Sequence, residues 1–131
     1  MKLLDVRKIW DEAPHNAFTD MVRFKGRFFC VFREGEGHVS PDGALHVIAS
    51  SDGVNWASAA LITSADSDLR DAKITVTPEN QLMLCGAEAL HDRSAQTHQS
   101  LAWFSDDGAG WSERVEIGDP CLLYTSDAAD E

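Results

Sequence analysis

The stretch Ser50-Ser51-Asp52-Gly53-Val54-Asn55-Trp56 decides the fold, because it returns 55 residues later as Ser105-Asp106-Asp107-Gly108-Ala109-Gly110-Trp111. Both copies read Ser-x-Asp-Gly-x-x-Trp. In such a turn the Ser and Asp side chains accept backbone N–H bonds, Gly adopts a positive φ, and Trp packs between sheets. We therefore expect a structural role for eight residues: Ser50, Asp52, Gly53, Trp56, Ser105, Asp107, Gly108 and Trp111.

The sequence around each copy predicts four strands. In the first repeat they are residues 21–25, 28–32, 45–49 and 57–63, and in the second 72–77, 82–87, 101–104 and 114–117. Thr19-Asp20 and Arg70-Asp71 hold matching places at the start of the innermost strands. Apolar residues do not recur at helical spacing over any long window. Repeats of about fifty residues with four strands each predict an all-β fold, a β-propeller of four-stranded blades.

The predicted domain organisation has four parts. Residues 1–17 hold an N-terminal strand at 3–10 that could close the last blade, residues 18–66 are the first blade, and residues 67–120 are the second. Residues 121–131 match one reading frame of a transposase sequencing adaptor, so we interpret them as a non-native tail and exclude them from the fold. Because two blades can neither close a ring nor cover their faces, we expect an inactive piece of a longer protein.

Composition excludes several classes of function. The 131 residues carry 22 acidic and 11 basic side chains, for a net charge of −11, and no basic stripe that could follow a phosphate backbone. Nucleic acid is therefore not an expected partner. No apolar run reaches a membrane span and no signal peptide is visible, so we expect no membrane partner, and the location stays open with the cytoplasm as default. Three cysteines without ligand spacing predict core thiols, no metal and no cofactor.

Both turns resemble the Asp-boxes of sialidases (neuraminidases) and related bacterial-neuraminidase-repeat (BNR) proteins. Residues 3–120 resemble the opening of sialidase-like propellers, most clearly at three segments: His15-Asn16-Ala17-Phe18-Thr19-Asp20, Val31-Phe32-Arg33-Glu34-Gly35-Glu36-Gly37-His38 and Asp68-Leu69-Arg70-Asp71-Ala72-Lys73. The resemblance implies a six-bladed parent. Both boxes are one residue shorter than typical sialidase boxes, a form that also resembles turns of five-bladed furanosidase-type and mannoside-phosphorylase-type propellers.

Polar residues gather at one end of the predicted ring, where the innermost strands start and the second-to-third loops lie, while the Asp-boxes lie at the other end. An Arg fork suits a carboxylate and glycoside cleavage needs carboxyl groups, one of them a proton donor. Because Asp71 follows Arg70 directly, a regular strand would point them to opposite faces. The candidates for substrate binding are Asp20, Arg33, His38, Arg70 and Arg93, and those for catalysis are Glu36, Asp71 and Asp92.

The resemblance implies a glycoside hydrolase of the exo-α-sialidase type that acts on terminal, acidic sugars, with carbohydrate as partner. Neither Arg33 nor Arg70 lies in the Arg-Ile-Pro tripeptide of typical sialidases, and no Tyr that could act as the nucleophile occurs in residues 1–120. Enzymatic activity of the parent is therefore left open. The alternatives are a non-catalytic carbohydrate-binding or interaction propeller, and an enzyme like the five-bladed furanosidases or mannoside phosphorylases.

Overall fold

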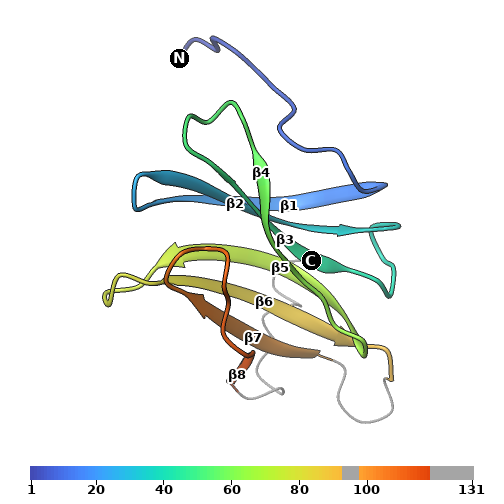
Figure 1. The fold of residues 1–131 in the computed structure, drawn as a ribbon. Helices are drawn as coiled ribbons and strands as arrows, with labels where there is room; N and C mark the ends of the chain where they lie inside the picture. Colours follow the sequence, from blue (N-terminus) through green and yellow to red (C-terminus); the bar gives the residue numbers. More distant parts are fainter. Residues whose placement is uncertain (93–97, 119–131) are drawn as a thin grey trace.

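The chain forms two four-stranded antiparallel sheets, each a simple up-and-down meander (Figure 1). The computed structural model describes residues 1–92 and 98–118. The first sheet contains β1 (His15–Phe24), β2 (Arg27–Gly35), β3 (Ala44–Ser50) and β4 (Ala57–Ile62), and the second contains β5 (Ser67–Val76), β6 (Leu82–Leu90), β7 (His98–Ser105) and β8 (Val115–Ile117). The all-β prediction of two four-stranded units is confirmed, because continuous apolar runs such as 28–32 and 45–49 do form the central strands.

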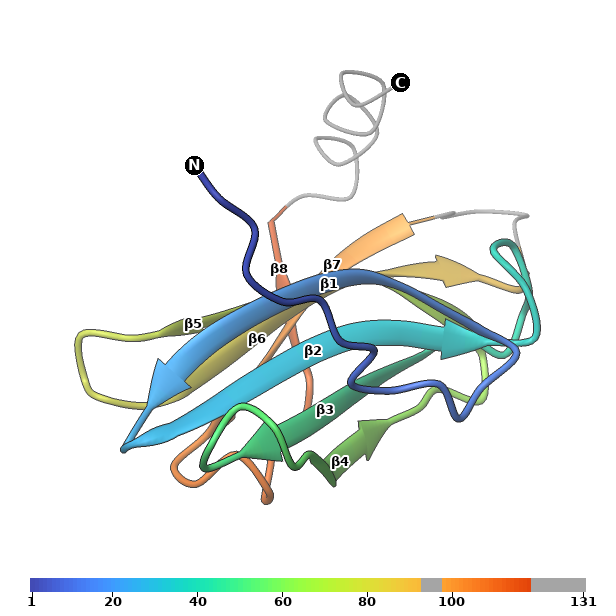
Figure 2. The same cartoon turned by 90° about the horizontal axis from the view of Figure 1, so that it is seen from above.

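The two sheets pack face to face, and the core lies between them (Figure 2). β5 contacts β1, β2 and β3, so the inner edge of the second sheet lies against the face of the first. Apolar side chains from both sheets fill the space, among them Phe29, Val47, Leu69, Leu84 and Trp103, each no more than 5% exposed. This burial removes apolar surface from water, the main favourable term in folding.

A bulge interrupts the innermost strand of each sheet at the matching position. The pairing shifts between Ala17 and Asp20 in β1 and between Arg70 and Lys73 in β5. Phe18 (φ 60°) and Asp71 (φ 56°) occupy the bulges with left-handed backbone. Asp71 therefore corresponds to Phe18, not to Asp20 as the sequence comparison had it, and both strands begin earlier than expected because the bulge breaks the alternation that marks a strand.

The N-terminal segment touches the outer face of the first sheet at Ile9 and Trp10, while residues 1–8 are exposed. Residues 3–10 pair with neither of the two described sheets, so their closing of a last blade stays a prediction, and His15 already belongs to β1. Instead, Ile9 and Trp10 pack on the buried cluster of Cys30, Phe32 and Ile48. An apolar sheet face needs a cover, and two large side chains supply it without backbone pairing. Residues 121–131 lie outside the described part of the chain.

The two Asp-box turns carry the same hydrogen bonds. In the first, the Asp52 carboxylate accepts the N–H groups of Val54 and Asn55 at 2.9 and 2.8 Å, and the Ser50 hydroxyl accepts that of Gly53 at 2.8 Å. Asp107 and Ser105 make the equivalent bonds in the second. The Trp side chains of both turns donate to the backbone oxygen of the turn glycine, Gly53 or Gly108. Each turn thus satisfies its own backbone at the end of the third strand.

The Asp-box carboxylates make stability depend on acid pH. Backbone N–H bonds, from Asn55 above all, hold the pKa of Asp52 well below its usual value, and Gly110 does the same for the pKa of Asp107. A lowered folded pKa stabilises above the unfolded value of about 3.9, and this stabilisation is lost as pH falls through the folded pKa. We expect the free energy of unfolding, measured in urea from pH 2 to 7, to fall below about pH 4.

The Asp52→Asn and Asp107→Asn variants isolate this effect, since Asn keeps the acceptor oxygen but cannot titrate. Their free energy of unfolding should fall less steeply below about pH 4 than that of the unchanged chain. An equally steep fall in both variants would mean that other carboxylates cause the acid sensitivity.

Gly53 and Gly108 share a left-handed backbone but differ in their surroundings. Their φ values are +74° and +84°, yet a Cβ on Gly53 would lie 3.8 Å from Phe28, whereas one on Gly108 would lie 2.1 Å from the Phe29 ring. Gly53→Ala should destabilise by about 1–2 kcal/mol through the backbone alone. Gly108→Ala should cost about 1–3 kcal/mol more, because it overpacks the contact between the sheets. Urea unfolding of both variants gives this difference, and equal losses would show that the second box does not press on Phe29.

Candidate functional site

A buried ion pair joins the two sheets beside the β2–β3 loop. Arg33, at the end of β2, is 0% exposed, and its Nε and Nη2 lie 2.9 and 2.8 Å from Asp68 Oδ1 on β5. Its remaining donors bind the backbone oxygens of Gly37 and Ser40 at 2.8 and 3.1 Å. A Cβ on Gly43 would lie 1.7 Å from the Asp68 carboxylate, so this position must lack a side chain. The loop and both sheets are built around the pair.

The prediction that Arg33 binds substrate is therefore wrong. A guanidinium that is fully buried, with protein acceptors around it, has no surface to offer a sugar. Arg33 instead holds the β2–β3 loop in shape, because its fork geometry suits several acceptors at once. The sequence placed it correctly at the end of an apolar strand but did not show that Asp68 would face it.

Asp20, a second predicted substrate ligand, also serves the fold. Its Oδ2 accepts the backbone N–H of Ile74 at 3.0 Å, and its Oδ1 accepts that of Met21 at 3.0 Å. Ile74 lies on β5, the free edge of the second sheet, so its N–H needs an acceptor from elsewhere. Asp20 thus links the first sheet to the second, and its role as a substrate ligand stays a prediction.

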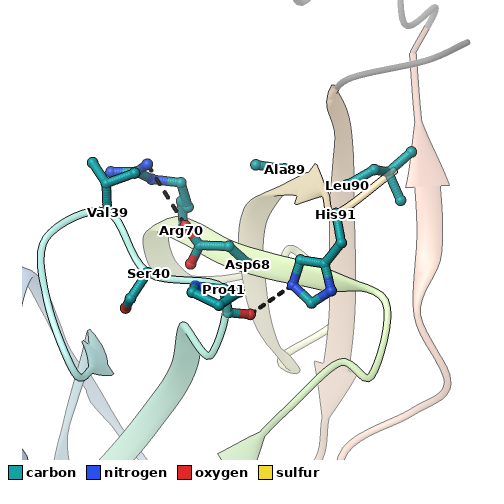
Figure 3. A pocket seen from close by; sticks show the side chains of 8 residues that line it. All are labelled: Val39, Ser40, Pro41, Asp68, Arg70, Ala89, Leu90 and His91. Atoms are coloured by element: carbon teal, nitrogen blue, oxygen red, sulfur yellow. Dashed lines mark hydrogen bonds and ion pairs between the residues drawn. The ribbon is translucent and has the colours of Figure 1, made fainter. Parts of the chain in front are cut away.

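A pocket of about 260 Å³ opens beside the ion pair (Figure 3). We call it the mouth pocket; its lining residues are Val39, Ser40, Pro41, Asp68, Arg70, Ala89, Leu90 and His91. The β2–β3 loop forms one wall, and the neighbouring ends of β5 and β6 form the other. The ring of His91 reaches across through Nε2, 2.7 Å from the Pro41 backbone oxygen. The pocket thus lies between the sheets, at the end where the innermost strands begin.

Arg70 is the cation of the mouth pocket. Its side chain is 23% exposed, its Nη1 lies 3.6 Å from Asp68 Oδ2, and its Nη2 donates to the His38 backbone oxygen at 3.3 Å. Asp68 thus faces Arg33 on one side and Arg70 on the other. Since both contacts of Arg70 are long, its N–H groups can bond a ligand oxygen in addition. The arrangement suits hydrogen bonding to hydroxyl or anionic oxygens.

Asp68 and His91 belong to the site although the sequence analysis did not select them. Asp68 lies two residues before Arg70, so the alternation of a strand puts both side chains on one face, and this signal could have found it. His91 follows β6 directly. Its contact with Pro41 depends on how the two sheets pack, which the sequence of one repeat does not specify.

The other predicted site residues lie around the mouth pocket without lining it. His38 is exposed, its backbone oxygen binds Arg70, and its ring lies 5.6 Å from that of His15 and 5.4 Å from that of Phe18. Glu36, Asp71 and Asp92 are all exposed, in the β2–β3 loop, at the β5 bulge and beyond β6. Their catalytic roles stay predictions, and Arg93 lies outside the described residues.

Within residues 1–92 and 98–118, no cluster of three or more His, Cys, Asp or Glu side chains is placed to hold a metal ion. No helix in that described part has the length and apolar character that a membrane-spanning helix requires.

Known proteins share this fold. The chain is similar to a GH93 α-L-arabinofuranosidase of Fusarium graminearum in complex with arabinobiose, with 17% identity and a TM-score of 0.63 over 77% of this chain and 32% of that one. The chain is also similar to a mutant Fusarium graminearum α-L-arabinofuranosidase with an iminosugar inhibitor, with 20% identity and a TM-score of 0.56 over 81% of this chain and 30% of that one. A proposed glycoside hydrolase of Parabacteroides distasonis ATCC 8503 matches with 13% identity and a TM-score of 0.54 over 79% of this chain and 32% of that one. The sequence matches no protein-family profile and no curated protein.

These likenesses define the class of fold. The chain is all-β, and its two four-stranded antiparallel sheets match about a third of a β-propeller glycoside hydrolase. It spans about a third of the length of the solved structures that it matches. At these identities the likeness concerns the fold, and the chemistry has to be argued from the site.

Proposed function

We propose that this chain supplies two blades of a propeller glycoside hydrolase that removes a terminal, neutral sugar of the arabinofuranoside class. The observation that carries the proposal is the mouth pocket, where Arg70, Asp68 and His91 meet between the two sheets. Support for the sugar class comes from the Fusarium graminearum enzyme, a GH93 α-L-arabinofuranosidase bound to arabinobiose. A pocket of about 260 Å³ lies just below the range of roughly 300–1,000 Å³ for drug-sized ligands, so it suits one small ring.

Charge favours a neutral sugar over the acidic one implied by the sialidase resemblance. With Arg33 buried against Asp68, Arg70 is the one partly exposed cation among the described pocket residues. Glu36, Asp71 and Asp92 lie exposed around it, so the described mouth is negative overall and repels a substrate carboxylate. A sugar hydroxyl carries no such penalty and accepts a hydrogen bond from Arg70.

In the proposed mechanism Arg70 orients the sugar by donating to its hydroxyl oxygens, while Asp71 protonates the departing glycosidic oxygen. The bulge between Arg70 and Lys73 interrupts the alternation of side chains between the two faces of the sheet. The side chains of Arg70 and Asp71 can therefore both face the mouth. Asp71 is exposed and, among the described residues, its carboxylate makes no hydrogen bond or ion pair, so it is free to contact the glycosidic oxygen of a bound sugar. The second carboxyl group that glycoside cleavage needs comes from Glu36 or Asp92 on the flanking loops.

Turnover of three substrates by the complete gene product tests the proposal: a 4-nitrophenyl α-L-arabinofuranoside, the corresponding arabinopyranoside and a 4-nitrophenyl sialoside. We expect hydrolysis of the furanoside alone. Turnover of the sialoside alone would restore the acidic-sugar interpretation and overturn this one. Saturable sugar binding without turnover of any substrate would favour the non-catalytic carbohydrate-binding alternative.

A further inference from the structure

Phe18 adopts a backbone conformation that a bulky side chain rarely takes. Its φ is 60°, in the left-handed region where glycine is common and an aromatic residue is an outlier. Such strain persists where the surrounding structure enforces it, and it concentrates at ligand-binding and catalytic positions. An aromatic side chain at position 18, where glycine would be unstrained, therefore calls for an explanation.

Core packing does not supply that reason. The Phe18 side chain is 45% exposed, and Phe18 is absent from both buried clusters described above. Among the described residues, the others outside glycine with left-handed backbone are Lys25, Asn80 and Asp71. Lys25 and Asn80 lie in the β1–β2 and β5–β6 turns, where a positive φ closes the hairpin. Phe18 thus combines strain with exposure at a position inside a strand.

The surroundings of Phe18 connect it to the mouth pocket. Its ring lies 5.4 Å from the ring of His38, at an angle of 50°. The His38 backbone oxygen binds Arg70, and the next residue, the 71% exposed Val39, lines the pocket. The bulges set Phe18 and Asp71 at matching places on the two innermost strands. An apolar ring, a hydrogen-bonding cation and a carboxylate therefore gather at one end of the sheets.

We propose that Phe18 is a stacking platform for a sugar ring, held at the mouth by the β1 bulge. The proposal rests on the proposed function. A sugar has an apolar face of C–H groups and a rim of hydroxyls, so its face packs on the Phe18 ring while its hydroxyls reach Arg70. The positive φ of Phe18 is retained because the β1 bulge directs the Phe18 ring to the mouth and not into the core.

The decisive variant is Phe18→Gly in the complete gene product, because it removes the ring and the strain together. We expect its midpoint of thermal unfolding to stay equal or rise, while the Kd for arabinobiose, measured by calorimetry, rises about 3- to 10-fold, the usual range for aromatic contacts. Phe18→Trp keeps an aromatic face and should bind within about 2-fold of the unchanged protein. A purely structural role for the ring would instead lower the unfolding midpoint and leave Kd unchanged.

Asn80→Gly is the matched control, since it relieves a φ of 61° in the β5–β6 turn, at the opposite end of β5 from the mouth. Its midpoint of thermal unfolding should stay equal or rise, as for Phe18→Gly, and its Kd for arabinobiose should stay unchanged. Equal arabinobiose affinity of the Phe18→Gly variant and the unchanged protein overturns the platform, as does an unchanged protein that binds no arabinobiose. If Phe18→Gly weakens binding but no glycoside is turned over, the platform stands and the hydrolase proposal fails.

Discussion

Replacing Arg33 with Met is expected to destabilise the chain by about 3–5 kcal/mol, the usual loss when one partner of a buried ion pair is removed. Met replaces the apolar part of the Arg33 side chain but not its charge. The carboxylate of Asp68, a residue that is only 5% exposed, then lacks its main partner. The other cation near Asp68, Arg70, lies at 3.6 Å and is partly exposed. Urea unfolding at pH 7 measures the loss directly.

Two further variants show that the loss comes from the unpaired charge. In Arg33→Met/Asp68→Leu neither charge of this pair is left buried, so most of the stability should return. Arg7→Met removes an exposed Arg whose partner Asp5 is also exposed, and such pairs contribute about 0–1 kcal/mol. If Arg33→Met costs no more than Arg7→Met, the pair does not hold the sheets together.

Replacing Asp71 with Asn is expected to lower kcat on the arabinofuranoside by about 10²- to 10⁴-fold, the range that general acid catalysis contributes. Asn tolerates a φ of 56° as Asp does, so the bulge and the stability should be retained. The measurement is steady-state kinetics of the complete gene product with an alkyl α-L-arabinofuranoside, whose leaving group needs a proton.

The leaving group distinguishes an acid from a merely structural carboxylate. A 2,4-dinitrophenyl group departs without protonation, so Asp71→Asn should lose much less activity on that substrate than on one with an alkyl leaving group. Glu79→Gln, in the exposed β5–β6 turn, removes a carboxylate far from the mouth and should leave both rates unchanged. Equal losses on both substrates would remove Asp71 from the role of acid.

The strands and the repeat could be predicted because they depend on local signals. The run Phe28–Phe32 is apolar at every position, which fits a strand covered on both faces, and the two Ser-x-Asp-Gly-x-x-Trp turns mark where the third strand of each sheet ends. The bulges could not be predicted this way. Nothing in the propensity of Phe18 indicates a positive φ, so the expected strand starts were late.

The site was predictable only in part, because it is made between the sheets. Arg70, predicted to bind substrate, lines the mouth pocket, and its role in binding stays a prediction. Arg33 looked equivalent in sequence but is buried against Asp68, which lies on the other sheet. Which charges face one another across two sheets depends on their packing, and the pattern of a single strand does not contain that information.

A crystal structure of the complete gene product with arabinobiose would show directly whether the sugar binds at the end of the sheets that carries the mouth pocket. We predict a sugar ring in the mouth pocket, with Arg70 donating to its hydroxyls and a second contact on the Phe18 ring. Arabinobiose bound at the Asp-box end, with the mouth pocket containing only solvent, would show that the mouth pocket is not the sugar site.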